Sequence, residues 1–259
     1  MLTHLQLLLG ALSGCLVGFS LGMVGGGGSI LAVPLMVYLV GVRSPHVAIG
    51  TSALAVAANA AIGLINHARQ GNVVWRCGLM YAVAGIVGAF AGSTMGKAFD
   101  GQRLLFLFAI VMVVVGVLML RSRGNVGVEG AVCDRTNAPR VISFGLGTGV
   151  FSGFFGIGGG FLIVPGLVAS TDMIMINAVG TSLLAVTAFG LTTALNYAGS
   201  GLVDWPLAAV FIGGGVIGTF AGTRAAKRLS AGGHLTSVFA VLIFVVAAYM
   251  LWKSAAAFV

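Results

Sequence analysis

Of the 259 residues in the chain, 59% are hydrophobic and only 7% are charged. Soluble domains carry about 25% charged residues, so these side chains are too few to cover a surface that faces water, and the composition indicates an integral membrane protein. The formal net charge of +8 comes from basic residues scattered through short loops, not gathered in one patch, which argues against nucleic-acid binding.

Ten apolar segments are predicted to form helices, so the expected fold class is an all-α polytopic membrane protein. In the first half they lie near residues 5–23, 29–41, 47–65, 73–96 and 104–120, and in the second near 141–155, 160–170, 174–196, 203–223 and 235–252. No Lys or Arg precedes Arg43, so we interpret the first segment as a permanent helix and not a signal peptide. The second segment of each half is too short to cross, because residues 29–41 would extend about 20 Å against a hydrocarbon core of about 30 Å.

The two halves of the chain repeat one another. The motif GMVGGGGSILAVP at residues 22–34 returns as GFFGIGGGFLIVP at residues 153–165, an offset of 131. At an offset of 130, the Gly-Thr-Ser segment at 50–52 returns at 180–182, and Asn66 matches Asn196. A duplication explains these matches. It divides the chain into a first membrane repeat at 1–121, a polar linker at 122–139 and a second membrane repeat at 140–259.

The distribution of basic residues predicts how the halves are oriented. With five crossings per half, one side of the membrane collects nine basic residues and the other collects four. If the first two segments of each half counted as one crossing, the split would be seven against six and would orient nothing. The positive-inside rule therefore favours an odd number of crossings per half, which makes the halves an inverted repeat with both termini outside the cytoplasm of a bacterial inner membrane. The nine are Arg69, Arg76, Arg121, Arg123, Arg135, Arg140, Arg224, Lys227 and Arg228.

Two glycine runs, Gly25 to Gly28 and Gly156 to Gly160, interrupt the apolar segments at membrane depth. A short helix is predicted to begin after each run, and the first N–H groups of a helix are unpaired and carry the positive end of its dipole. Glycine lets an anion approach such amides closely. Two helix starts that face each other near the bilayer midplane would form a site for a small oxyanion without a buried arginine.

The alternative interpretation is that the glycines only allow close helix packing. That interpretation suits other glycines, which recur at every fourth residue on one helix face as small-xxx-small seams. These seams are Gly10, Gly14, Gly18 and Gly22; Gly88, Gly92 and Gly96; and Gly145, Gly149 and Gly153. The consecutive runs do not have this spacing. They are also a poor match to a nucleotide-binding P-loop, because no lysine follows Gly28 or Gly160.

The paired runs, each followed by a Gly-Thr-Ser segment, and the duplicated membrane layout resemble the TauE/SafE family of sulfite and organosulfonate exporters. The resemblance covers nearly the whole chain, although the first copy carries Gly26 and Ser29 where the second carries Ile157 and Gly160. It implies a membrane transporter or facilitator that exports a small sulfur-containing oxyanion. An anion channel, and a permease for another small anion or sulfur metabolite, are the alternatives left open.

The candidate substrate-binding residues are the glycine runs and the polar side chains predicted to lie at membrane depth. The Gly-Thr-Ser hydroxyls either donate to an anion or bond back to carbonyls of their own helix, and the asparagine amides face a cavity or another helix. Pro34 and Pro165 are expected to end or kink the short helices. The full substrate-binding set is Gly25, Gly26, Gly27, Gly28, Ser29, Thr51, Ser52, Asn59, Asn66, Gly156, Gly158, Gly159, Gly160, Thr181, Ser182 and Asn196.

The ionisable residues give little support to other functions. All five acidic residues, and His4, His46, His67 and His234, fall in loops or near segment ends. Proton coupling through a buried carboxylate is therefore not expected, and export down a gradient is the simpler expectation. His67 and Arg69, a basic pair found in one half only, are interpreted as solvated loop charges. We predict no enzymatic activity, because an intramembrane serine protease would need a histidine at membrane depth near its nucleophilic serine.

The cysteines indicate neither a disulfide framework nor a zinc site, because Cys15, Cys77 and Cys133 are widely spaced and form no CxxC pair. We therefore predict no metal and no cofactor. The expected partners are a small anionic substrate and the lipid bilayer, with no nucleic acid, and a homo-oligomer is compatible with the sequence. A non-transporting membrane scaffold is the last alternative, but it would not require broken helices at matching depths in both halves.

Overall fold

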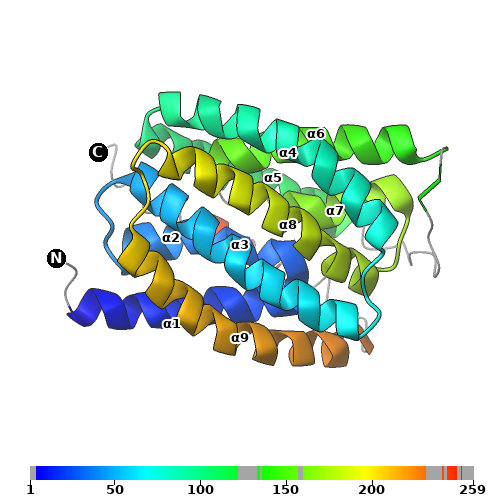
Figure 1. The fold of residues 1–259 in the computed structure, drawn as a ribbon, viewed down its shortest axis with the longest axis horizontal. Helices are drawn as coiled ribbons and strands as arrows, with labels where there is room; N and C mark the ends of the chain where they lie inside the picture. The colour runs from blue at the N-terminus through cyan, green and yellow to red at the C-terminus, as the bar shows by residue number, and fades with distance from the viewer. Residues whose placement is uncertain are drawn as a thin grey trace.

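The structure, a computed structural model, describes residues 4–121, 133–134, 136–156, 160–231, 241, 244–249 and 252. All regular secondary structure in this part of the chain is helical (Figure 1). The first half contains α1 (His4–Val24), the 3-10 helix η1 (Gly25–Leu31), α2 (Ala32–Pro34), the π-helix η2 (Leu35–Leu39), α3 (Pro45–Arg69), α4 (Trp75–Ala98) and α5 (Gly101–Arg121). The second half contains α6 (Ala138–Phe155), α7 (Gly160–Thr171), α8 (Met175–Ala198) and α9 (Trp205–Ala231).

The predicted all-α membrane fold is confirmed. Five helices are long and apolar enough to cross a membrane, namely α1, α3, α4, α8 and residues 205–226 of α9. Most predicted segments agree with the helices to within about four residues. Two differ more: helical structure begins at Gly25, within the first glycine run, and α9 continues to Ala231, well beyond the predicted end near residue 223. The last predicted segment, 235–252, lies mostly outside the described residues; residues 241, 244–249 and 252 of it are helical.

Short local signals set the helix boundaries. Ser44 is the N-cap of α3 and its hydroxyl accepts from the Val47 N–H at 3.5 Å, while Pro45 occupies the first helical position, where no N–H is needed. Gly156 ends α6 in the left-handed conformation, with φ +67°, which a side chain would disfavour. These signals fix where each helix stops, but not what it packs against.

The helices pack in pairs through the glycine seams. In Figure 1, α4 and α6 lie along one edge of the molecule, α1 and α9 lie along the other, and α3 and α8 cross between them. A Cβ atom built on Gly18 of α1 would lie 2.1 Å from the Gly215 carbonyl oxygen of α9. A Cβ atom on Gly149 of α6 would lie 2.3 Å from the Gly85 carbonyl oxygen of α4. Both pairs of helices therefore touch backbone to backbone, as the four-residue spacing predicts.

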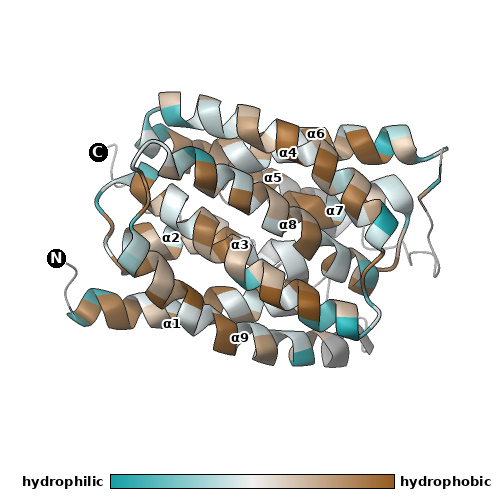
Figure 2. Ribbon diagram, viewed as in Figure 1, coloured by the Kyte–Doolittle hydropathy of each residue, from teal (hydrophilic) through white to brown (hydrophobic). Residues whose placement is uncertain are grey.

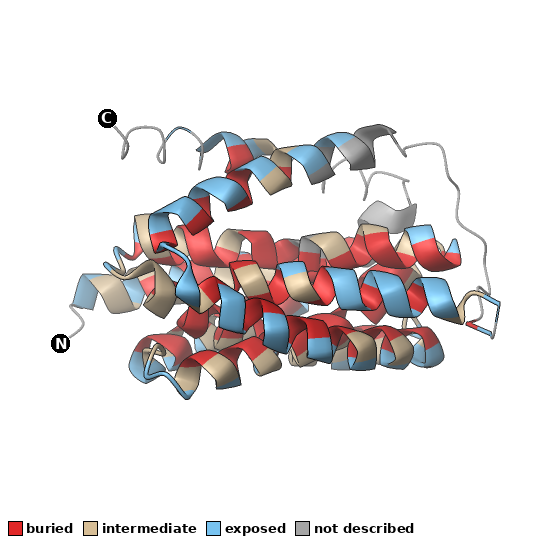
Figure 3. Ribbon diagram, turned by 90° about the horizontal axis from the view of Figure 1, so that it is seen from above, coloured by how far each residue is buried: buried red, intermediate tan, exposed pale blue. Residues whose placement is uncertain are grey.

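Apolar side chains cover the outside of the molecule as well as its inside. Figure 2 shows hydrophobic residues on most faces of the helices, and Figure 3 shows that the buried residues gather where the helices meet. Large side chains such as Leu8, Phe90 and Ile217 are exposed, Ile217 to 71%. A soluble protein rarely exposes so much apolar surface, so these side chains are suited to contact with lipid.

A disulfide joins Cys77, near the start of α4, to Cys133 in the linker, with 5.3 Å between the Cα atoms. The expectation that the cysteines form no disulfide was wrong, because a separation of 56 residues gives no spacing motif and only the fold brings the two thiols together. Both residues are fully buried. Cys15 is a free thiol.

Breaking this disulfide is expected to lower the melting temperature of the detergent-solubilised protein. Closing a loop of this length removes chain entropy worth about 4 kcal/mol in the loop-closure model. Wild-type protein should melt several degrees lower in dithiothreitol, Cys133→Ser should melt low with or without it, and Cys15→Ser should behave like wild type. Identical melting curves for wild type and Cys133→Ser would refute the prediction.

Candidate substrate site

Each glycine run ends the helix before it with a glycine that has a positive φ. Gly25 has φ +66° and ends α1, and Gly156 has φ +67° and ends α6. After Gly25 the chain continues as the 3-10 helix η1, and α7 begins at Gly160. Residues 157–159, which include the predicted site residues Gly158 and Gly159, lie outside the described part of the chain. For Gly27 the structure describes the secondary structure but not the burial.

The two runs meet in the interior of the protein. A Cβ atom on Gly160 would lie 1.6 Å from the Gly26 carbonyl oxygen, and one on Gly26 would lie 2.7 Å from the Gly160 Cα atom. Both glycines are buried. Gly28 is packed equally tightly against the backbone of Ser20 and Leu21 in α1. Only glycine permits these approaches, so the first run is fixed against α1 on one side and against the second run on the other.

Two serine side chains bond Gly26, one from the second Gly-Thr-Ser segment and one that directly follows the run. Its N–H donates to the Ser182 hydroxyl oxygen at 3.0 Å, and its carbonyl accepts from the Ser29 hydroxyl at 2.9 Å. The Ser182 hydroxyl in turn donates to the Val179 carbonyl at 2.7 Å. In this conformation the Gly26 amide is therefore not free but is paired with an oxygen atom that α8 supplies.

The other hydroxyls of the Gly-Thr-Ser segments bond backbone groups of the protein. Thr51 accepts from the Asp204 N–H at 2.9 Å, and Thr181 accepts from the Val74 N–H at 2.9 Å. Each threonine thus holds the loop that precedes α9 or α4, in the opposite half of the chain. Ser52 donates back to the Ile49 carbonyl of its own helix. The threonines accept from backbone N–H groups of the other half, whereas the sequence predicted bonds to an anion or to carbonyls of their own helix.

Asn59 is fully buried near the middle of α3, and neither its amide nitrogen nor its oxygen has a hydrogen-bond partner within the described residues. It packs on Gly215 of α9, where a Cβ atom would lie 1.9 Å from the Asn59 amide nitrogen. At the equivalent place in the other half, Phe189 packs on Gly85 and stacks on Tyr81. An unpaired buried amide is costly, which singles out Asn59 among the predicted polar residues. The Asn66 amide nitrogen is also buried without a partner in the described residues.

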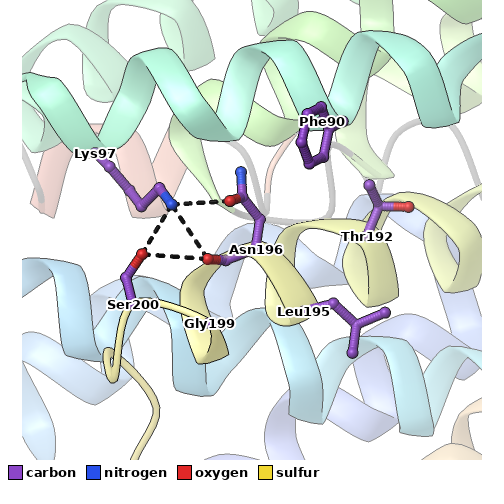
Figure 4. Close-up of a pocket in the computed structure, with 7 residues that line it drawn as sticks. All are labelled: Phe90, Lys97, Thr192, Leu195, Asn196, Gly199 and Ser200. Carbon is purple, nitrogen blue, oxygen red and sulfur yellow. Dashed lines mark hydrogen bonds between the residues drawn. The ribbon is translucent and has the colours of Figure 1, made fainter.

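Asn196 lines an open pocket of about 590 Å³ between α4 and α8, whose lining includes no residue of the glycine runs (Figure 4). The Lys97 ammonium donates to the Asn196 side-chain oxygen at 2.8 Å, to its carbonyl at 3.2 Å and to the Ser200 hydroxyl at 2.9 Å. These three bonds use all the donors of an ammonium group, so Lys97 joins the end of α4 to the end of α8. From the sequence, Lys97 was only one of the four basic residues on the less charged side of the membrane; its match to Lys227 at the offset of 130 was the available signal.

His67 is fully buried inside α3, so its interpretation as a solvated loop charge was wrong, whereas Arg69 is exposed as expected. The helix continues to Arg69, farther than the predicted segment, and carries the imidazole into the interior. Its Nε2 atom lies 2.9 Å from the Gly22 carbonyl oxygen, next to the first glycine run. Among the described residues, no group of three or more His, Cys, Asp and Glu side chains could hold a metal ion.

The two prolines lie within the short helical segments. Pro34 is buried and ends α2, directly before the π-helix, and Pro165 lies inside α7. Proline removes one backbone donor and disturbs the hydrogen-bond pattern of a helix. The change from α-helix to π-helix at Pro34 is of the kind that such a disturbance produces.

Comparison with known proteins supplies the wider context. The family model of the sulfite exporter TauE/SafE matches residues 10–250. A probable membrane transporter protein of Xylella fastidiosa (strain 9a5c) is 52% identical over 95% of both chains. The probable membrane transporter protein YdhB of Bacillus subtilis (strain 168) is 26% identical over 81% of this chain and 86% of its own. No solved structure matches the chain. The polytopic helical fold and these matches agree on a multi-pass membrane transporter, and the chain belongs to the sulfite exporter TauE/SafE family.

Proposed function

We propose that the chain exports a small sulfur-containing oxyanion, sulfite or an organosulfonate, and that this cargo binds where the two glycine runs meet. The observation that carries the proposal is the backbone contact between Gly26 and Gly160, which come from opposite halves of the chain and meet inside it. Backbone amides at the start of helical segments attract anions. Bringing two such starts together concentrates that attraction at one place.

An oxygen atom already occupies the position proposed for the cargo. The Gly26 N–H donates to Ser182 Oγ at 3.0 Å, so an oxygen fits against this amide with ordinary hydrogen-bond geometry. A sulfite or sulfonate oxygen would replace the hydroxyl oxygen there. Ser182 would retain its bond to Val179 or turn its hydroxyl toward the anion.

The charge distribution suits an anion that binds and then leaves. Neutral amide and hydroxyl donors hold an anion less tightly than a buried arginine would. The acidic residues that the structure describes are Asp100, Asp134, Asp172 and Asp204, and all four lie in connections between helices, where they do not repel an anion at membrane depth. This arrangement fits export down the concentration gradient of the cargo.

The proposal includes halves related as an inverted repeat. Two sets of contacts support a two-fold relation between the halves, because the halves exchange roles in them, and the odd number of crossings predicted for each half would make that relation an inverted one. Gly18 packs on Gly215, and the residues equivalent to them, Gly149 and Gly85, also pack on each other. The loop contacts of Thr51 and Thr181 are exchanged in the same way. An inverted pair of halves offers the cargo equivalent routes to the two membrane faces.

The test is flux through vesicles that contain the purified protein, with sulfite, thiosulfate, sulfate, sulfoacetate and taurine each loaded inside. We expect efflux of sulfite or sulfoacetate well above that from protein-free vesicles, and we expect Ser182→Ala to alter it more than Ser52→Ala. Ser52 is the matched control, because its hydroxyl donates only to its own helix. Efflux of none of the five compounds from vesicles that contain folded protein would reject the proposed cargo.

A further inference from the structure

Where α1 meets the first glycine run, a carbonyl and an N–H that would pair in a continued helix each bond a side chain instead. In a continued α-helix, the Gly22 carbonyl would accept from the Gly26 N–H, four residues on. Here α1 ends at Val24, the Gly22 carbonyl lies 2.9 Å from His67 Nε2, and the Gly26 N–H donates to Ser182. His67 belongs to α3 and Ser182 to α8, the two central helices, which pack against each other.

The hydrogen bonds assign the neutral form of the His67 ring. A carbonyl oxygen only accepts, so Nε2 carries the hydrogen that is donated to Gly22. Nδ1 lies 3.4 Å from the Asn72 amide nitrogen, which is a donor, so Nδ1 accepts. With both ring nitrogens used in this way and no solvent exposure, the imidazole acts as a fixed hydrogen-bond donor to the end of α1.

The described residues of the second half show no equivalent of the His67 contact. Tyr197 is the counterpart of His67 at the offset of 130, and its buried hydroxyl has no partner among the described residues. The Gly153 carbonyl, the counterpart of Gly22 at the offset of 131, accepts from the Gly156 N–H of its own helix end at 3.2 Å. Among the described residues, a side chain from a neighbouring helix therefore bonds this carbonyl in the first half only.

We propose that His67 is a positioning residue for transport, which keeps the Gly26 amide turned away from α1 so that an oxyanion can bind it. The inference rests on the proposed function of the glycine runs. Without the imidazole, the buried Gly22 carbonyl loses this donor, and it recovers the Gly26 N–H as its partner. Helix α1 then lengthens into the run, and the amide is withdrawn from the cargo.

Three variants test this role through sulfite efflux. His67→Leu fills the space without a donor and should slow efflux about tenfold, which is what the loss of one buried hydrogen bond amounts to. His67→Gln keeps an amide donor of similar reach and should restore efflux to within about threefold of wild type. Tyr197→Phe is the matched control and should transport normally, because its hydroxyl bonds nothing in the described structure. Should His67→Leu fail to insert, His67→Asn, whose amide is too short to reach Gly22, takes its place with the same expected loss.

Hydrogen–deuterium exchange of the peptide that spans residues 19–31 separates this inference from the proposed function. In His67→Leu, we expect slower exchange at Gly26, because its N–H joins the α1 ladder, while His67→Gln should match wild type. This readout needs no cargo, so it stands even if wild-type vesicles release no sulfite. Unchanged exchange and efflux in His67→Leu, or His67→Gln as impaired as His67→Leu, would overturn the positioning role.

Discussion

Gly160→Ala is expected to slow transport about tenfold or more while the protein still inserts and folds. The added methyl group would lie 1.6 Å from the Gly26 carbonyl oxygen and 2.2 Å from the Gly26 carbonyl carbon, which are backbone atoms that cannot turn aside as the tip of a side chain can. Gly160 is the first residue of α7, and alanine is a better helix former than glycine. The damage therefore falls on the contact between the two runs and not on the helix.

Overpacking of this kind costs about 1–3 kcal/mol, so sulfite efflux from vesicles should fall about tenfold or more. Gly147→Ala is the matched control, since Gly147 lies in α6 and a Cβ atom there meets nothing within 4 Å. It should insert, fold and transport like wild type. If Gly160→Ala vesicles release sulfite at the wild-type rate, close contact between Gly26 and Gly160 is not needed for transport.

The helices of the fold could be predicted from the sequence because each is a long apolar run that ends at strong local signals. The turns between α3 and α4 and between α8 and α9 contain Gly71 and Gly201, both with positive φ, and the predicted segments stop on either side of them. The seams were predictable for the same reason, since their spacing is a property of one helix. Which helix each seam would meet was not, because the partner of Gly18 lies almost two hundred residues away.

Part of the candidate site could be predicted from the sequence and part could not. The glycine runs were recognisable from their composition, and Asn59 from its depth in an apolar segment. The partners of Thr51, Thr181 and His67 were not, because each bonds a backbone group that only tertiary packing brings near. His67 illustrates the cause: a position near the end of an apolar segment is exposed only if no neighbouring helix covers it, and here the end of α1 does.

Gly18→Leu is expected to prevent folding of the α1–α9 pair, which is the second large effect. A Cβ atom at Gly18 would lie 2.1 Å from the Gly215 carbonyl oxygen and 2.7 Å from the Gly215 Cα atom, so a leucine cannot fit unless the two helices separate. Membrane helices associate mainly through close packing, so their separation removes most of what holds this pair together. We expect little monodisperse protein in size-exclusion chromatography and a melting temperature too low to measure.

Gly213→Leu is the control for this effect, because Gly213 lies on the exposed side of α9, where a Cβ atom meets nothing within 4 Å. It should give wild-type yield and melting temperature. Gly149→Leu makes the same substitution at the equivalent place in the α4–α6 pair, with 2.3 Å to the Gly85 carbonyl oxygen, and should be as damaging as Gly18→Leu. Normal yield from either seam variant would mean that backbone contact is dispensable there. Loss from only one of them would mean that the two helix pairs, alike in their contacts, differ in how much of the fold depends on them.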